Sequence, residues 1–288
     1  MGMRKSGNLD PRLVQKITTL KAILEAKGAV LIAFSGGVDS SFLLAVASEV
    51  LSGNVVALMT ISPSTPPQDA KQATQLAKRL SVELLSIQHN ELAIPEYTAN
   101  PVNRCYFCKN SLYEICRRTA ERLSLPAIAD GVNLDDLGDY RPGLQAAEEY
   151  GVFHPLVEAR FTKEEIRQAS QVLGLPTWCK PASPCLSSRV PYGTRITAKM
   201  LSQISQAESF LQTLGVEQLR VRFNGRSARI EIDKRVLSKI TSPKTLKAIG
   251  EYLKSQGIPL VTLDLEGYKS GVFNTGIEVI RPKTIDFA

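Results

Sequence analysis

The sequence contains no apolar run close to the roughly 20 residues that a helix needs to cross a bilayer. It also contains no internal repeat and no low-complexity segment. Its beginning, MGMRKSGNLDPRL, is basic and lacks the apolar stretch of a secretory signal peptide. We therefore expect a cytoplasmic globular protein without membrane attachment.

The chain has five cysteines, an odd number, whereas a framework of disulfides needs an even number. In a cytoplasmic protein an odd number of cysteines favours metal, cluster or thiol chemistry. Charge is not balanced either: 35 Lys and Arg residues against 28 Asp and Glu residues give a net charge of +7. This excess favours an anionic partner, either nucleic acid or a phosphorylated small molecule, although a solvated basic surface would carry the same charge.

What the chain does contain is a regular alternation of strand-like and helical segments. Strands are expected at 29–34, 55–61, 82–87 and 127–130, and helices at 10–27, 39–51, 66–80, about 105–124 and 162–174. Beyond these the pattern is helix, two strands, helix and strand, at 198–214, 218–223, 228–233, 243–255 and 260–265. Alternating strands and helices are typical of a parallel sheet covered on both faces. We predict an α/β domain with a doubly wound parallel sheet at 1–190 and a smaller C-terminal α+β domain at 191–288.

The stretch VLIAFSGGVDSS, residues 30–41, places a Ser-Gly-Gly turn between an apolar strand and a helix. The glycines allow a tight turn, and the helix start behind them offers free N–H groups and a positive dipole end to a phosphate. No Gly-Lys-Ser/Thr follows, so this is not a Walker A loop. Asp39 would repel a bare phosphate, and its expected task is to hold Mg²⁺ that screens the charge of ATP. A plain turn in which Ser and Asp cap the helix is the alternative.

The cysteines form the second candidate site. Cys105 and Cys108 are a Cys-x-x-Cys pair at an expected helix start, where the helix dipole lowers thiol pKa values. Cys185 lies far along the chain in a Pro-bracketed loop. A redox pair is one interpretation, and a structural zinc site that recruits Cys179 or Cys116 is another. Three thiolates without a fourth protein ligand favour an iron–sulfur cluster with one open iron, which could hold an extra sulfide.

Several segments resemble known signatures. SGGVDS (35–40), HPLVEARFTKEEIRQASQVLGLP (154–176) and the Pro-Cys at 184–185 resemble the PP-loop ATP pyrophosphatase superfamily, whose members activate a carbonyl oxygen as an adenylate. DYRPGLQAA (139–147), SSRVPYGTRIT (187–197) and the pair LRVRF and ARIEI resemble the LarE family of ATP-dependent sulfur transferases. This resemblance covers nearly the whole chain. It implies that the substrate is pyridinium-3,5-biscarboxylic acid mononucleotide, and that both carboxylates become thiocarboxylates for the nickel-pincer cofactor.

The resemblance also implies roles for individual residues. It assigns ATP binding to the loop residues Ser35, Gly36, Gly37, Asp39 and Ser40, with Mg²⁺ at Asp39. It assigns catalysis to Lys109, Cys185, Ser188 and Arg189, and the substrate phosphate to Arg220 and Arg222. Glu208 and Glu231 match carboxylates of a divalent metal site whose further aspartate has no clear counterpart here. For the arginine pair, a solvated polar strand face is the alternative.

The family has two sulfur sources. Some members give up the sulfur of one cysteine and keep dehydroalanine, whereas others bind a [4Fe–4S] cluster through three cysteines. Cys105, Cys108 and Cys185 match the second pattern, so a cluster-borne sulfide is favoured over sacrifice of Cys185. The family also implies a homo-oligomer and a small anionic mononucleotide as partner, without nucleic acid.

Two rival functions stay open at this point. Some tRNA 2-thiolation enzymes also combine a PP-loop with a three-cysteine cluster, and the basic charge is compatible with tRNA. They usually have Lys where this chain has Val38, and a zinc-finger-like cysteine cluster before the loop, which is missing here. The other rival is a non-catalytic nucleotide-binding module with a zinc clip.

Overall fold

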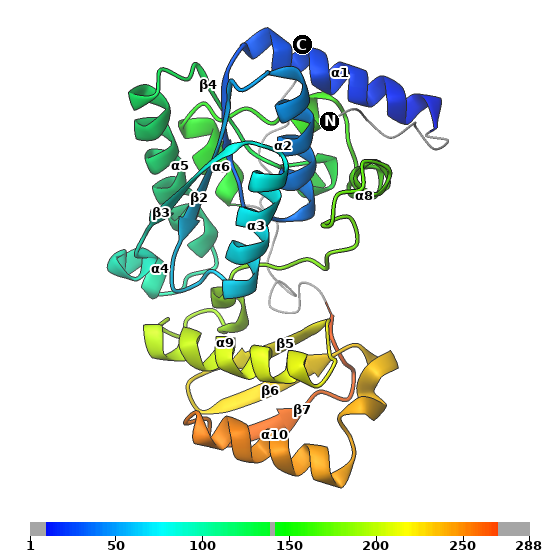
Figure 1. Ribbon diagram of the computed structural model, residues 1–288. Helices are drawn as coiled ribbons and strands as arrows, with labels where there is room; N and C mark the ends of the chain where they lie inside the picture. The colour runs from blue at the N-terminus through cyan, green and yellow to red at the C-terminus, as the bar shows by residue number, and fades with distance from the viewer. Residues whose placement is uncertain (1–9, 139–141, 270–288) are drawn as a thin grey trace.

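The computed structural model describes residues 10–138 and 142–269. In this part of the chain the first sheet is parallel, with strand order β3-β2-β1-β4 (Figure 1). Its strands are β1 (Val30–Ala33), β2 (Val55–Ile61), β3 (Glu83–Gln88) and β4 (Ala127–Ala129). β1 is central, so the turn that follows it opens at the middle of the sheet's carboxyl edge, where ligands bind in open α/β sheets.

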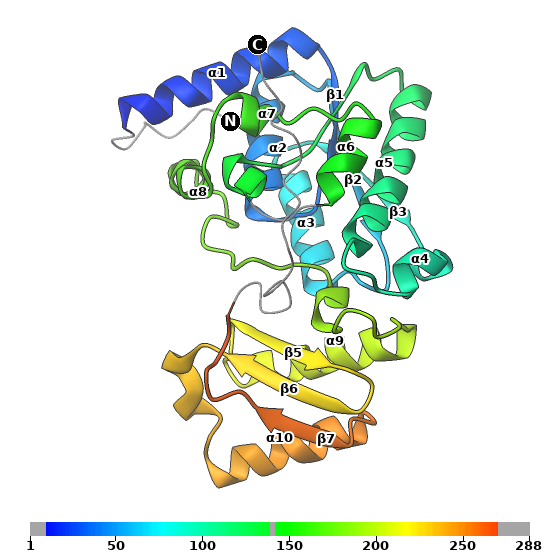
Figure 2. The same cartoon turned by 180° about the vertical axis from the view of Figure 1, so that it is seen from behind.

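Helices cover both faces of this sheet (Figures 1 and 2). The α-helices of this unit are α1 (Pro11–Lys27), α2 (Val38–Val50), α3 (Pro67–Arg79), α4 (Pro95–Thr98), α5 (Arg104–Arg122), α6 (Gly143–Glu149), α7 (Pro155–Glu158) and α8 (Lys163–Val172). Short 3-10 turns are η1 (Glu91–Ala93), η2 (Leu134–Gly138) and η3 (Leu186–Arg189). Side chains alternate along β1: Val30 and Ile32 face one core, and Leu31 and Ala33 the other.

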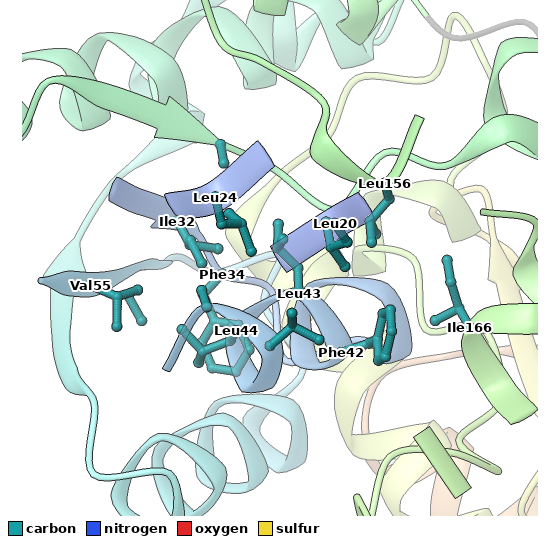
Figure 3. Packing of buried hydrophobic residues seen from close by; sticks show 14 of the residues in the cluster. Leu20, Leu24, Ile32, Phe34, Phe42, Leu43, Leu44, Val55, Leu156 and Ile166 are labelled. Atoms are coloured by element: carbon teal, nitrogen blue, oxygen red, sulfur yellow. The ribbon is translucent and has the colours of Figure 1, made fainter. Parts of the chain in front are cut away.

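The core on the first face is built by α1, α2, α3 and α8 against the sheet. Leu20, Leu24, Phe42 and Ile166 meet there, all of them fully buried (Figure 3). The opposite face is covered by α5 and α6. Cys116 lies in that second core with no exposed surface, so it packs in the interior of the first unit.

The C-terminal unit has a mixed sheet of order β5-β6-β7, antiparallel between β5 and β6 and parallel between β6 and β7. Its elements are α9 (Ala198–Thr213), β5 (Leu219–Phe223), β6 (Ser227–Ile232), η4 (Lys234–Lys239), α10 (Pro243–Ser255) and β7 (Leu260–Leu263). α9 and α10 lie behind this sheet in Figure 2, so one sheet face carries both helices. The expected fold class, a doubly wound parallel sheet followed by a smaller α+β unit, is confirmed.

The second unit's core does not begin at residue 191. Tyr97 from α4 and both Leu186 and Val190 from the connecting segment pack into it. The connection is therefore part of both units, and the proposed division at 190/191 passes through packed structure. The segment DYRPG, which supported the family resemblance, is only partly within the described residues, because 139–141 lie outside them.

Candidate active site

The turn after β1 has the geometry of an anion-binding loop. Gly36 has φ +69°, a backbone conformation that favours glycine. The Gly37 N–H donates to Ser35 Oγ at 3.3 Å, and the hydroxyls of Ser35 and Ser40 are 3.1 Å apart. Gly37 is the N-cap of α2 without a side-chain cap bond, so the first N–H groups of this helix face the turn.

Two glycines let other elements approach this turn closely. A Cβ on Gly36 would stand 2.8 Å from the Cβ of Ala73 in α3. A Cβ on Gly131, just after β4, would stand 2.7 Å from the backbone nitrogen of Ser40. The turn is thus enclosed by α3 on one side and by the β4 loop on the other.

Asp39 lies in the first turn of α2 and forms an ion pair with Lys163 of α8 through Oδ2. Its other oxygen, Oδ1, is buried without a hydrogen-bond partner among the described residues. A buried carboxylate oxygen without a donor is costly unless a cation or a water completes it. Asp39 therefore fits the Mg²⁺ ligand that the sequence predicted, with Lys163 as a second charge at the same position.

The segment that follows α8 returns to the turn. Lys180 Nζ donates to the carbonyl of Gly36 at 3.1 Å and pairs with Asp69 Oδ1 of α3 at 2.9 Å. Ser183 Oγ donates to the other oxygen of Asp69 at 2.7 Å. This connection, residues 180–189, therefore begins in direct contact with the phosphate loop.

The three predicted cluster cysteines lie in one electrostatic neighbourhood. Cys105 and Cys108 are in the first turns of α5, and Cys185 directly precedes η3. The pKa of the Cys108 thiol is raised well above its ordinary value by burial, and further by the charges of Glu91, Cys185 and Cys105. Cys108 Sγ donates to Glu91 Oε1 at 3.2 Å. Burial also raises the pKa of Cys185, while the Arg104 guanidinium opposes this shift.

All five cysteines are free thiols. In residues 10–138 and 142–269, no three His, Cys, Asp or Glu side chains are arranged to hold a single metal ion. A four-iron cluster binds each thiolate through a different iron, so its ligands stand farther apart than those of one ion. Three neighbouring thiols are the donor set that such a cluster takes.

Arg189 is buried and its guanidinium is fully engaged. It forms two parallel bonds of 2.9 Å to the carboxylate of Glu208 in α9. It also donates to the carbonyls of Pro184 and Cys185 and to Ser188 Oγ, at 2.5, 3.1 and 3.1 Å. The structure thus places Arg189 and Ser188 beside Cys185, and it gives Glu208, a predicted metal ligand, an arginine partner.

Arg220 and Arg222 are two residues apart in β5 and therefore extend from the same face of the strand. Arg220 donates to the carbonyls of Leu219, at 2.6 Å, and Ala182, and its guanidinium lies 5.0 Å from the ring centroid of Tyr268. Arg220 is only 6% exposed, which excludes a solvated strand face at this position. Burial, and then the nearby Arg189 guanidinium, lower its pKa.

Arg222 donates to the carbonyl of Ser188 at 2.8 Å and to Glu231 at 3.1 Å. Glu231 is buried and also accepts from Arg229 at 2.8 Å. The second predicted metal carboxylate is therefore paired with two arginines. Its role as a metal ligand remains a prediction.

Lys109 lies in α5, beside a buried polar group around Asp130 that the sequence did not predict. Its Nζ is 5.1 Å from the ring centroid of Tyr113, whose hydroxyl donates to Asp130 at 2.6 Å. Asp130 also contacts His154 Nδ1 at 2.7 Å. Burial alone would raise the pKa of Asp130, but the His154 hydrogen bond and the charges of His154 and Lys109 lower it below its ordinary value.

Other residues of the site were also missed by sequence reasoning: Asp69, Glu91, Arg104, Lys163 and Lys180. They lie in helices or connections where a single charged residue carries no periodic or spacing signal. Only Asp130 and Lys163 had an available cue, because Asp130 ends a predicted strand and Lys163 lies inside the HPLVEARFTKEE segment.

Comparison with known proteins identifies the family. A family model described as NAD synthase matches residues 12–100. The chain is 35% identical over 263 residues to the pyridinium-3,5-bisthiocarboxylic acid mononucleotide synthase of Lactiplantibacillus plantarum, which covers 91% of this chain and 95% of that protein. The chain belongs to the LarE family. It is also similar to the uncharacterized proteins slr1717 of Synechocystis (45% identity, 91% of this chain and 98% of that one) and MJ0830 of Methanocaldococcus jannaschii (30%, 89% and 98%).

The resemblance drawn from sequence motifs is thereby confirmed, and with it the PP-loop ancestry of the phosphate loop. Within the described ranges, no helix is both long and apolar enough to cross a membrane.

Proposed function

We propose that this LarE family member is an ATP-dependent sulfur transferase that converts pyridinium-3,5-biscarboxylic acid mononucleotide to its bisthiocarboxylate. The similar protein from Lactiplantibacillus plantarum bears the name of that synthase. ATP would activate each carboxylate as an acyl-adenylate, and a sulfur nucleophile would then displace AMP.

The observation that carries this proposal is the path of one short segment, residues 180–189. Lys180 at its start contacts Gly36 of the phosphate loop. Cys185 lies in its middle, and the carbonyls of Ala182 and Ser188 accept from the arginine pair on β5. These ten residues thus carry Cys185 and contact both the phosphate loop and the arginine pair on β5.

For the first half-reaction, the α2 amino terminus and the hydroxyls of Ser35 and Ser40 would bind the ATP phosphates. Asp39 would hold Mg²⁺ through its unpartnered Oδ1, and the ion would neutralise charge on the departing pyrophosphate. Lys109 would place its ammonium beside the developing negative charge at the adenylate, with Tyr113 and Asp130 fixing its position.

For the substrate, Arg220 and Arg222 would bind the mononucleotide phosphate. Both guanidinia are largely buried and near a third, that of Arg189, and such grouped cations favour an anion between them. No carboxylate lies within ion-pair distance of Arg220 among the described residues, whereas Arg222 shares Glu231 with Arg229.

For the second half-reaction, Cys105, Cys108 and Cys185 would bind a [4Fe–4S] cluster. When bound, such a cluster would supply an iron-held sulfide as the sulfur nucleophile. Direct sacrifice of the Cys185 sulfur is the second candidate, and the burial of Cys185 beside Arg104 and Arg189 is compatible with it. We propose the cytoplasm as the compartment, because free thiols and a cluster need reducing surroundings. A homo-oligomer remains part of the proposal.

The test is ATP–pyrophosphate exchange measured with and without the pyridinium mononucleotide. We expect exchange that requires this substrate and Mg²⁺, and none with unmodified tRNA. Exchange that depends on tRNA would instead support tRNA thiolation as the function. Nucleotide binding without exchange under either condition would support the alternative of a non-catalytic nucleotide-binding module.

A further inference from the structure

The chain brings Cys185 to the Cys105–Cys108 pair across about 80 residues of sequence, and the contacts that hold it there are buried. Arg104 directly precedes Cys105 and is 3% exposed. Its Nη1 donates to the carbonyl of Ser187, two residues after Cys185, at 3.1 Å, and to Asn100 Oδ1 at 2.5 Å.

Asn100 extends the same attachment. It is fully buried and has φ +56°, a conformation that non-glycine residues adopt rarely. Its Nδ2 donates to the carbonyls of Pro191 and Thr194, at 2.7 and 3.0 Å. The start of α5 and the turn before it therefore hold the chain on the C-terminal side of Cys185.

A second attachment reaches the segment from Cys108. The Cys108 thiol contacts Glu91, Glu91 accepts from Ser64 Oγ at 2.6 Å, and the Ser64 carbonyl accepts from the Leu186 N–H at 2.8 Å. Ser64 and Glu91 are 3% and 6% exposed. Arg104 and the Cys108 thiol are thus linked through interior hydrogen bonds to Ser187 and Leu186, the residues that follow Cys185.

We propose that Arg104 is a positioning residue that holds Cys185 beside Cys105 and Cys108 in the metal-free protein, so that the three-thiol site is formed before a cluster arrives. The inference rests on the proposed function only for the purpose of the three thiols, which is to bind a cluster. A guanidinium is suited to this task because the two hydrogens of its planar Nη1 point in fixed directions, toward the Asn100 and Ser187 oxygens, whereas a lysine ammonium sits on a flexible stem. Loss of this charged, buried hydrogen bond would leave the segment with fewer attachments, among them the Leu186–Ser64 bond, so residues 185–187 would depart from their place in a larger share of molecules.

The test is thiol cross-linking in metal-free, reduced protein with dibromobimane, which bridges two neighbouring thiols, followed by peptide mapping. In the unmodified chain we expect bridges between Cys185 and Cys105 or Cys108. In Arg104→Met, bridges that contain Cys185 should fall by roughly ten- to a hundredfold. The Cys105–Cys108 bridge should not fall, because α5 alone sets that spacing.

Arg118→Met is the matched control, since it makes the same substitution on an exposed arginine of the same helix. Arg104→Lys keeps the charge and gives a decisive result even where the methionine variant fails to fold; its Cys185 bridges should fall severalfold. Yields in both Arg104 variants equal to the Arg118→Met yield would overturn the proposal, as would an unmodified chain that forms no bridge to Cys185. The assay contains no iron, ATP or substrate, so failure of the proposed reaction would leave its result readable.

Discussion

At the residue scale, the two carboxylate oxygens of Asp39 have different surroundings. One oxygen pairs with Lys163, and the other is buried without a partner among the described residues. The sequence predicted this residue and its metal role from its place after Ser-Gly-Gly. It did not predict Lys163, which only the packing of α8 against α2 brings to the same point.

Asp39→Ala should lower substrate-dependent ATP–pyrophosphate exchange by roughly a hundredfold or more, the loss typical of one charge-stabilising group. The fold should be retained, because Phe42, Leu43 and Leu44 make the core packing of α2 and Asp39 adds only a partly exposed ion pair with Lys163. Glu49→Ala is the control, since Glu49 is a half-exposed, ion-paired residue of the same helix. Exchange at the normal rate in Asp39→Ala would contradict the assignment of the phosphate loop.

Arg220→Ala and Arg222→Ala should each weaken binding of the pyridinium mononucleotide, while ATP affinity stays unchanged. Removing one charge-assisted contact costs about 1.5–3 kcal/mol, or roughly ten- to a hundredfold in affinity. Arg229→Ala is the control on the same sheet face, because Arg229 pairs with Glu231 and is 42% exposed. Calorimetric titration measures all three. Equal substrate affinity in the two test variants and the control would contradict the proposal that Arg220 and Arg222 bind the substrate phosphate.

Residue identity alone could not distinguish side chains that bind a ligand from side chains that stabilise the fold. Arg189 and Glu208 were predicted as a catalytic residue and a metal ligand, and the structure pairs them with each other. Their burial arises from contact between α9 and the connecting segment, which are adjacent in sequence but whose packing no local pattern encodes.

At the scale of elements, the sequence predicts the long helices and the buried strands well because periodicity and capping are local. α10 begins at Pro243 and ends at Ser255 as predicted, and α8, within the helix predicted at 162–174, begins with a capping box of Thr162 and Glu165. The short helices α4, α6 and α7 were missed, since four to seven residues hold too little periodicity. α4 matters for function, because it leads into the Cys105–Cys108 helix.

Gly131→Ala should displace the start of α2 and weaken ATP binding, because the new Cβ would meet the Ser40 nitrogen at 2.7 Å and that backbone cannot rotate away. Such overpacking costs about 1–3 kcal/mol of unfolding free energy. Gly138→Ala is the matched control, since a Cβ there meets nothing within 4 Å. Denaturant unfolding and ATP titration together test this. Normal ATP affinity in Gly131→Ala would show that the β4 loop does not shape the phosphate site.

At the scale of the whole molecule, the two units share the connecting segment as common structure. Leu186 and Val190 belong to the core of the second unit, while Lys180 and Ser183 contact the first. Composition and motif order predicted two units with Cys185 in the loop before 190/191, but not that this loop would contact both the phosphate loop and β5. The folded chain shows that this one connection contacts the phosphate loop through Lys180 and β5 through the Ser188 carbonyl.

The most direct measurement of the central claim is multiple-turnover sulfur transfer by anaerobically purified protein, with iron content and intact protein mass determined before and after. The account predicts about four iron atoms per chain, more than one thiocarboxylate formed per chain when sulfide is supplied, and an unchanged protein mass. Replacing Cys105, Cys108 or Cys185 by Ala should abolish the iron and the transfer while sparing adenylation. A single turnover that leaves the protein lighter by one H₂S, with dehydroalanine at position 185, would contradict the cluster as the sulfur source.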